Sequence, residues 1–517
     1  MEDKENSFGR GEDLEEIRDG DTFIAIIIRA RYHSPGVKFF TPSTFSQQLG
    51  FLNHKKGNII KNHVHNPVPR EVIYTQEVLF IREGKLRVDL YGNSNRFITS
   101  RILEGGDVIL LAGGGHGFEI LEDTSMIEVK QGPYAEVDDK RYFSRRVSNM
   151  IPVNEPLFSN REKELLCECI DSGYISSEGP FVRQFEETFA SYIGVKHGVA
   201  VCNGTVALDT AIAVINLKAG EEVIMPSFTI ISCAMAVVRH SGIPVLVDAE
   251  PETWCMDVNH VEARITPRTR AIMPVHMYGH PVDMYPIMAI AGKYNLYVIE
   301  DAAEVHGAEY RGRKCGSIGQ ISCFSFYANK IITTGEGGMV LTDDDDIAER
   351  ARSYRNLCFR PEKRFYHTEP GQNYRMTNLQ AAVGVAQMER IDEFVEIKRH
   401  NAALYTKLLL GIKGIQLPVE RPWAKNVYWM YGILLDKNIG MDATSLAKEL
   451  KARDIGTRPF FLGMHEQPVF HNMGLFKGES YPVSEEIARQ GLYLPSGLTL
   501  KEEQIEKVCN ALKEIMT

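Results

Sequence analysis

The sequence predicts an α/β protein with a mostly parallel, doubly wound sheet, preceded by a separate all-β domain. After residue 151, helical patterns such as REKELLCECIDSG alternate with apolar strand-like runs such as EEVIMP and LYVIED. This alternation is typical of a parallel sheet with helices on both faces. Before residue 134, short apolar runs are broken by Gly, Asn and Pro, which predicts an antiparallel barrel or sandwich.

Changes in pattern along the 517 residues give the expected boundaries. Residues 1–20 are acidic and polar, and we expect them to be disordered. The all-β domain is expected at 21–134, followed by a charged linker at 135–150. The large α/β domain is expected at 151–395. A smaller α+β domain is expected at 396–517, where the run WMYGILLD precedes the helical patterns ATSLAKELKARD and KEEQIEKVCNALKEI.

Bulk composition excludes several classes of protein. The net charge of -10 disfavours nucleic acid as a partner, because phosphate contacts need clustered Lys and Arg. The 9 cysteines include no CxxC pair, which is typical of reduced cytosolic thiols. The acidic N-terminus is unlike a signal peptide, and the run FIAIII is too short to span a bilayer. We therefore expect a cytoplasmic protein with no membrane partner.

The segment CNGTVALDTAIAV places Asn203, Gly204 and Thr205 directly before a helical pattern. A glycine there lets the backbone approach a ligand, and the N-terminus of a helix favours a phosphate dianion. The segment therefore predicts a phosphate site. A plain helix cap by Asn203 or Thr205 explains the same residues equally well.

Two further segments carry side chains that could take part in catalysis. LYVIEDAAEVHGA puts Asp301 at the end of an apolar strand, where open α/β sheets bind ligands, although the residue could also cap a helix. SCFSFYANKIITTGEGG places Ser325 and Lys330 between an aromatic run and a Gly-rich stretch, an unusual setting for a surface lysine. A lysine, a carboxylate and a phosphate cradle are what pyridoxal-phosphate (PLP) transamination requires.

Long segments in the same order resemble one family. From about residue 151 to the end, the chain resembles the DegT/DnrJ/EryC1/StrS sugar aminotransferases, which have the fold-type I PLP architecture. The segments that carry the resemblance include IPVNEPLF, IEDAAEVHGAEYRGRKCGSIG, FSFYANKIITTGEGGMVLTDD and NYRMTNLQAAVGVAQMERID. Such long ordered runs are far more specific than a single short motif.

The resemblance implies roles for individual residues. Lys330 would bond the cofactor aldehyde and move the proton, and Asp301 would pair with the pyridine nitrogen. The other implied cofactor contacts are Asn203, Gly204, Thr205, Ile230, Glu304, Ser325 and, from a neighbouring subunit, Asn373. The implied substrate contacts are Ser176, Ser177, His306, Tyr428 and Tyr431. Active sites shared between subunits imply a homodimer or a higher homo-oligomer.

One position departs from the family pattern. The residue that stacks on the cofactor ring is usually aromatic, whereas the run from Pro226 to Ile230 ends in isoleucine. The aromatic stacking contribution of about 0.5–1.5 kcal/mol is then lost. Either the cofactor is held less tightly or Phe228 compensates.

The resemblance also implies the substrates. The family's dehydratases carry histidine in place of the lysine, so Lys330 favours amination of a keto-sugar nucleotide with glutamate as donor. The likeness is greatest to members that aminate C4 of GDP-4-keto-6-deoxymannose. The nucleotide, the hexose and C3 against C4 amination stay open. A PLP-fold sensor without turnover is a second interpretation, which the intact Lys330, Asp301 and Ser325 disfavour.

The front domain resembles the cupins. The segments Gly57-NIIKN-His63-Val-His65 and Glu77-VLFIRE-Gly84 resemble the first cupin motif, with a longer gap than usual between His65 and Glu77, and Gly106-DVILLAGGG-His116 resembles the second. Three histidines and one carboxylate suit a divalent transition metal, and residues two apart on a strand point the same way. A metal-free or inert barrel is the alternative. A cupin isomerase or epimerase fused to an aminotransferase for a dTDP or UDP sugar is the alternative function.

Overall fold

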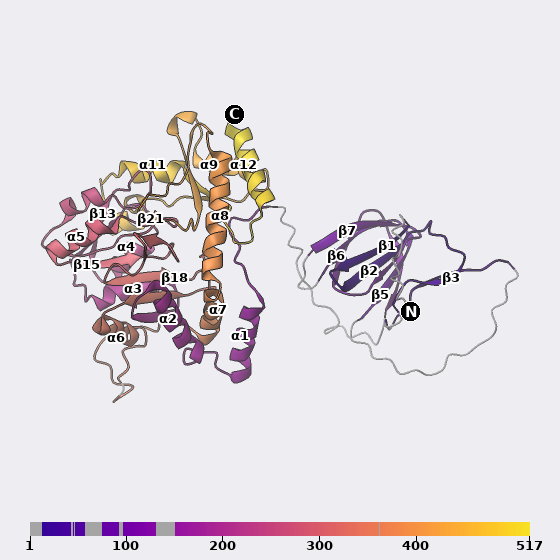
Figure 1. Cartoon of the computed structure of the whole chain (residues 1–517), viewed down its shortest axis with the longest axis horizontal. Coiled ribbons are helices and arrows are strands. Elements are labelled where there is room, and N and C mark those ends of the chain that lie inside the picture. The colour runs from indigo at the N-terminus through magenta and orange to yellow at the C-terminus, as the bar shows by residue number, and fades with distance from the viewer. Residues whose placement is uncertain are drawn as a thin grey trace. The chain divides into compact units, whose positions relative to one another are not determined.

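The computed structural model describes residues 13–42, 45, 47–56, 75–92, 97–130, 150–360 and 362–516. The chain divides into two compact units, Met1–Val147 and Ser148–Thr517, and each unit contains its own apolar clusters (Figure 1). Of the expected linker, only residue 150 lies within the described residues. In the described part of the chain, no helix combines the length and the apolar character needed to cross a membrane.

The first unit is built from strands over its described residues. Its five-stranded antiparallel sheet has the order β1 (Leu14–Asp19), β2 (Thr22–Ile28), β8 (Val108–Leu111), β5 (Glu77–Glu83), β10 (Ser125–Lys130). The other sheets are β7 (Phe97–Glu104), β6 (Lys85–Tyr91), β9 (Gly115–Ile120) and the pair β3 (Gly36–Phe39), β4 (Gly50–Asn53). The strands support the expected all-β unit, and the cupin barrel stays a prediction.

Strand β1 shows that the end of the segment expected to be disordered, Leu14–Asp19, forms a strand, while residues 1–12 lie outside the described residues. It pairs antiparallel with β2, and Ile17 is buried in the core of the unit. A charged residue of the strand also has a partner, since Glu15 accepts hydrogen bonds from Arg101. Composition alone suggested disorder because it does not reveal such partners.

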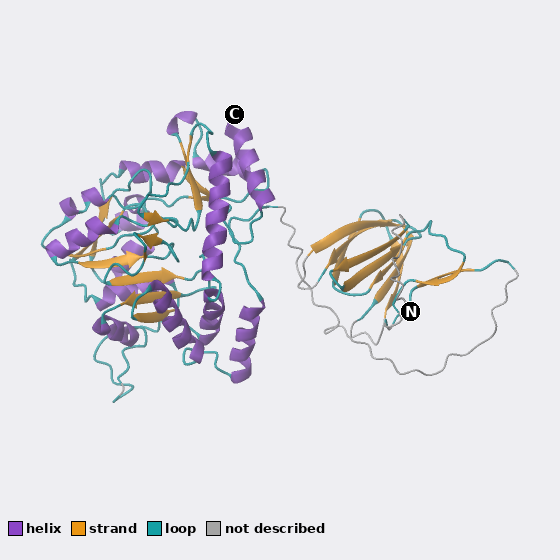
Figure 2. Ribbon diagram, in the orientation of Figure 1, coloured by secondary structure: helices purple, strands orange, loops and turns teal. Residues whose placement is uncertain are grey.

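The second unit contains a seven-stranded sheet with helices on both faces (Figure 2). The order is β11 (His197–Val201), β19 (Gly338–Thr342), β18 (Ile321–Ser325), β15 (Tyr297–Asp301), β14 (Thr269–Ile272), β12 (Glu222–Pro226), β13 (Ile243–Val247). Only β19 runs antiparallel to its neighbours. It follows β18 through a loop without a helix, and that loop carries Lys330. The sheet is therefore mostly parallel, as predicted.

Eight helices accompany this sheet in the described residues: α1 (Asn160–Ser172), α2 (Pro180–Ile193), α3 (Gly204–Val214), α4 (Ser232–Arg239), α5 (Met284–Tyr294), α6 (Asp345–Tyr354), α7 (Asn378–Met388), α8 (Ile391–Leu409). Local sequence sets their ends. A capping box between Ser159 and Glu162 starts α1, and Gly173 ends it in the left-handed conformation at φ 77°. Helix α8 continues through residue 395, so the smaller part begins inside a helix.

The smaller part packs a four-stranded sheet against helices. Its strands are β20 (Ile415–Gln416), β22 (Tyr431–Leu435), β24 (Gly491–Leu494), β23 (Arg458–Pro459), and its helices are α9 (Ala443–Lys451), α10 (Pro468–Asn472), α11 (Pro482–Gln490), α12 (Glu502–Met516). A small sheet joins β17 (Arg313–Lys314), β16 (Glu309–Tyr310) and β21 (Ala424–Lys425). The last of these strands, β21, lies just before Trp429 and pairs with β16, which brings this segment back beside the residues that follow β15.

Candidate active site

The candidate site lies at the carboxyl ends of β15 and β18. Asp301 is the last residue of β15 and Ser325 the last of β18, and these strands are parallel neighbours. Lys330 follows in the loop after β18, where its backbone N–H donates to the Tyr327 carbonyl at 2.9 Å. The sheet topology thus gathers residues that are far apart in sequence at one edge, as open α/β sheets do for ligands.

The phosphate cradle is formed by the N-terminus of α3 and the end of β18. A Cβ atom on Gly204 would lie 2.6 Å from the Ser325 Cβ, so only glycine allows this close approach. The Asn203 side chain caps the helix by accepting from the Val206 N–H at 3.0 Å. Asn203 therefore caps the helix, and the same helix N-terminus is still available as the candidate phosphate cradle. The Thr205 hydroxyl lies 2.9 Å from the hydroxyl of Ser232, a residue that the sequence reasoning missed.

Asp301 is buried and held in place. Its Oδ2 accepts from the Cys233 thiol at 3.1 Å, and its Oδ1 accepts from the Ala303 N–H at 3.1 Å. No helix begins after Asp301 before β16, which excludes the role of helix cap. Burial, together with the Asp301 carboxylate, raises the pKa of the Cys233 thiol well above its usual value. The thiol therefore remains protonated and donates to the carboxylate.

Lys330 lies close to Asp301 and to a second carboxylate, that of Glu304. Its Nζ is 3.9 Å from Glu304 Oε1 and 3.6 Å from the centroid of the Trp429 ring. Burial lowers the pKa of Lys330, and the carboxylates of Glu304 and Asp301 oppose that change. Burial in turn raises the pKa of Glu304, which the Lys330 charge opposes. The lysine and both carboxylates therefore form one electrostatic group.

Two expected substrate contacts are buried in the structure. Tyr431 lies on β22 in the core of the smaller part, where its ring stacks on Tyr405 at 4.8 Å and its hydroxyl pairs with Thr406 at 2.8 Å. His306 is fully buried, and its nearest rings include those of Phe324 and Phe326 at 5.3 and 5.6 Å. Burial and Lys330 lower the pKa of His306 to about 3. Both side chains are enclosed in the core, and their contact with the sugar stays a prediction.

The other expected contacts lie on open segments. Ser176 and Ser177 lie between α1 and α2, where the Ser176 carbonyl accepts from the Asn378 N–H at 2.7 Å. Asn373 is exposed. Ile230 exposes 39% of its surface, an open apolar side chain just before α4. Phe228, by contrast, is fully buried among other aromatic rings, so it does not replace Ile230.

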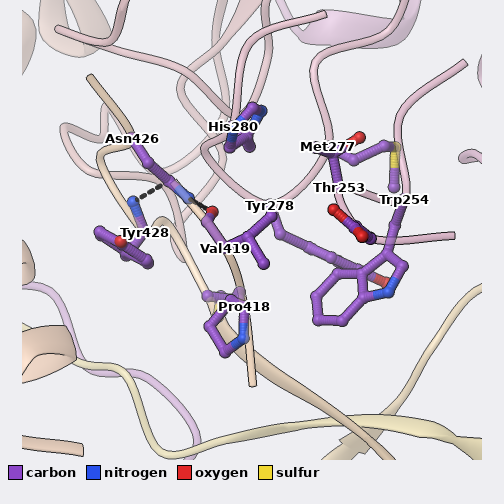
Figure 3. Close-up of a pocket in the computed structure, with 11 residues that line it drawn as sticks. Thr253, Trp254, Met277, Tyr278, His280, Pro418, Val419, Asn426 and Tyr428 are labelled. Atoms are coloured by element: carbon purple, nitrogen blue, oxygen red, sulfur yellow. Dashed lines mark hydrogen bonds between the residues drawn. The ribbon is translucent and has the colours of Figure 1, made fainter. Parts of the chain in front are cut away.

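Tyr428 borders a small pocket beside the site. Figure 3 shows it with Tyr278 and Trp254 on three segments that meet there, and with Asn426, whose Oδ1 accepts from the Tyr428 N–H at 2.7 Å. The backbone N–H of Tyr278 donates to Glu304 at 2.7 Å. The pocket thus shares a wall with the carboxylate beside Lys330.

Comparison with known proteins identifies the family. A model described as the DegT/DnrJ/EryC1/StrS aminotransferase family matches residues 156–513. The chain belongs to this family. It is therefore a PLP-dependent aminotransferase by class, and the resemblance seen in the sequence is confirmed.

Individual relatives cover the second unit almost completely. A GDP-perosamine synthase from Caulobacter vibrioides is 42% identical over 71% of this chain and 98% of that protein. A dTDP-3-amino-3,4,6-trideoxy-alpha-D-glucose transaminase from Streptomyces venezuelae is 36% identical over 68% of this chain and 90% of that protein. The structure of S. venezuelae DesV in complex with a ketimine intermediate has TM-score 0.65 and 35% identity, covering 69% of this chain and 94% of that one. The fold-type I architecture is confirmed.

The residues of this aminotransferase fit PLP. The Gly204–Ser325 approach leaves a side-chain-free cradle beside a helix N-terminus, which suits a phosphate. Asp301 offers a fixed carboxylate for a ring nitrogen, and Lys330 offers a buried amine for an aldehyde. Ile230 supplies open apolar surface. Trp429, which lies between the expected contacts Tyr428 and Tyr431, was not predicted, because nothing in the sequence pairs it with Lys330.

In the first unit, Glu77 and His116 lie 3.2 Å apart between Oε2 and Nε2, on β5 and β9 of different sheets. The expected ligands His63 and His65 lie outside the described residues. Within those described residues, no group of three or more His, Cys, Asp or Glu side chains is arranged to hold a metal ion. The metal site stays a prediction.

We predict that Cys233→Ala weakens PLP binding to the apoprotein by roughly fivefold, since Asp301 loses a hydrogen bond of about 1 kcal/mol. Cys233→Ser should retain most of the affinity, because a hydroxyl also donates. The measurement is a PLP titration of apoprotein followed by absorbance. Cys323→Ala is the matched control, because Cys323 is equally buried and makes no hydrogen bond to Asp301. Equal losses in the two alanine variants would contradict the role of Cys233.

Proposed function

We propose that this aminotransferase moves the amino group of glutamate onto C4 of GDP-4-keto-6-deoxymannose, giving GDP-perosamine. The observation that carries the proposal is the nearly buried amine of Lys330 beside the carboxylates of Glu304 and Asp301, at the edge of the sheet where the candidate phosphate cradle also lies. The 42% identity to a GDP-perosamine synthase over 98% of that protein supports the choice of substrate. A dTDP or UDP keto sugar is the alternative, supported by the relative that acts on a dTDP sugar.

The chain's own residues would supply binding and proton transfer. When bound, PLP supplies an aldehyde that receives the amino group and a ring that delocalises electrons. Burial lowers the pKa of Lys330, so more of the amine is neutral and able to take a proton. The same group, once protonated, can return a proton to the sugar carbon. The Asp301 carboxylate, fixed by Cys233 and Ala303, favours a protonated ring nitrogen.

We predict that Lys330→Ala reduces amination at least roughly a thousandfold, because it removes both the bond to the cofactor and the proton carrier. The assay offers glutamate with GDP-, dTDP- and UDP-linked 3-keto and 4-keto sugars. Mass spectrometry and NMR read the product. The wild-type protein should aminate the GDP-linked 4-keto sugar at C4 with the highest kcat/KM.

The exposed Lys407 on α8 provides the control, and Lys407→Ala should be as active as the wild type. Turnover retained in Lys330→Ala would overturn the assignment of the lysine. A wild-type protein that binds PLP but transfers nothing from glutamate would favour the sensor interpretation.

We also propose a homodimer whose active sites are shared, with Asn373 reaching the phosphate site of a neighbouring subunit. Exposure of Asn373 is compatible with contact to another chain. Asn373→Asp should inactivate, because it brings a negative charge to a phosphate. Co-expression of Asn373→Asp with Lys330→Ala should restore about a quarter of the wild-type activity, since half of the dimers have one intact site. Activity no higher than that of the two variants alone would exclude shared sites.

For the first unit we propose a divalent transition metal held by His63, His65, Glu77 and His116. The 3.2 Å approach of Glu77 to His116 across two sheets supports it, since these donors suit such ions. His116→Ala in the full chain should lose at least half of the zinc retained after dialysis, while amination by the second unit is unchanged. His33→Ala, in the same unit, is the control. Wild-type protein that retains no metal would contradict this proposal.

A further inference from the structure

The ring of Trp429 lies against the amine of Lys330. The Nζ atom is 3.6 Å from the ring centroid, and the indole is almost fully buried. The indole Nε1–H donates to the carbonyl of Asn329 at 2.7 Å. Because Asn329 directly precedes Lys330, this bond fixes the ring relative to the loop that carries the lysine.

The backbone of Trp429 is held as firmly as its ring. The ammonium of Lys398, a buried residue of α8, donates to the Trp429 carbonyl at 3.0 Å and also to the Ser496 carbonyl. The ring of Tyr278 stacks on the indole with centroids 6.2 Å apart. Gly279, at φ 110°, approaches so closely that a Cβ there would lie 2.6 Å from the Trp429 nitrogen. Contacts from several segments therefore place one aromatic face beside one amine.

The charged and titratable groups facing Lys330 are Glu304, Asp301 and His306. Of these, the carboxylate of Glu304 is 3.9 Å from the amine and could take its proton. An aromatic face attracts an ammonium through its quadrupole, but it is not a base. Trp429 can therefore hold the charged lysine without removing the proton that the lysine must deliver.

We propose that Trp429 is a positioning residue that holds the protonated Lys330 amine while that amine is not bonded to the cofactor. The inference rests on the proposed function, in which Lys330 takes up a proton and, once protonated, returns one to the sugar carbon. The ring gives the ammonium a contact in addition to that with Glu304, on a face that cannot take its proton. Trp429 thus acts through Lys330.

The test measures the titration of Lys330 in the apoprotein. Competitive labelling with acetic anhydride, read residue by residue with mass spectrometry, gives the pH midpoint of each lysine. The ring stabilises the charged form, so its removal lowers the midpoint. We expect Trp429→Leu to lower the Lys330 midpoint by roughly 0.5 to 1.5 units and Trp429→Phe by less. Trp423→Phe is the control, because that ring packs on His280 and Tyr310 and should leave the midpoint unchanged.

Steady-state kinetics separate positioning from substrate binding. In Trp429→Leu, kcat for amination should fall roughly tenfold while KM for the sugar nucleotide changes by less than about threefold. An unchanged midpoint in folded Trp429→Leu overturns the inference, as does a rise in KM without any shift in midpoint. If Trp429→Leu does not fold, the midpoint of Trp429→Phe decides in the same way. A shifted midpoint in a protein that transfers no amino group would refute the proposed function and leave the contact between Trp429 and Lys330 established.

Discussion

A buried amine sets the main constraint on the second unit. Taking an ammonium out of water is costly unless opposite charge or oriented dipoles compensate. Here the carboxylates of Glu304 and Asp301 and the face of Trp429 compensate, and each comes from a different stretch of chain. The strand edge delivers Asp301, the turn after it delivers Glu304, and the segment leading into the smaller part delivers Trp429. The same burial that makes the ammonium costly to hold lowers the pKa of the lysine, so more of the amine is neutral and able to act as a base.

The fold was largely predictable because hydrophobic pattern reports it directly. Runs such as EEVIMP and LYVIED became buried parallel strands, and RQFEETFASYIG became a helix that ends at Gly194 in the left-handed conformation at φ 86°. Strand β1 was missed because LEEIRD consists mainly of charged residues. Its stability depends on the β2 ladder and on Arg101, more than eighty positions away, and no local window contains that information.

The site was predictable where spacing along one segment defines it. Three of the predicted residues are the first or last residue of a regular element, namely Gly204, Asp301 and Ser325, and Lys330 follows β18 by five residues. Cys233, Ser232 and Trp429 act through contacts that span 27 to 100 residues, and sequence reasoning had no means to pair them. Tyr431, in contrast, was expected as a substrate contact from its place in the sequence. It is two residues from Trp429, yet it packs in the core of the smaller part, because strand β22 begins only at Tyr431 and Trp429 lies in the irregular segment before it.

The aromatic residues that line the small pocket beside Glu304 have a strained backbone. Three non-glycine residues that line the pocket in Figure 3, Trp254, Tyr278 and Tyr428, have φ values of 62, 51 and 48°. Bulky side chains avoid this region, and such residues persist only where the surrounding structure determines them. Here the determining contacts include the Asn426 bond to Tyr428 and the Glu304 bond to Tyr278. Tertiary packing therefore overrides local preference where the carboxylate, the lysine and the indole meet. Because these conformations depend on tertiary contacts, local sequence patterns do not predict this part of the site.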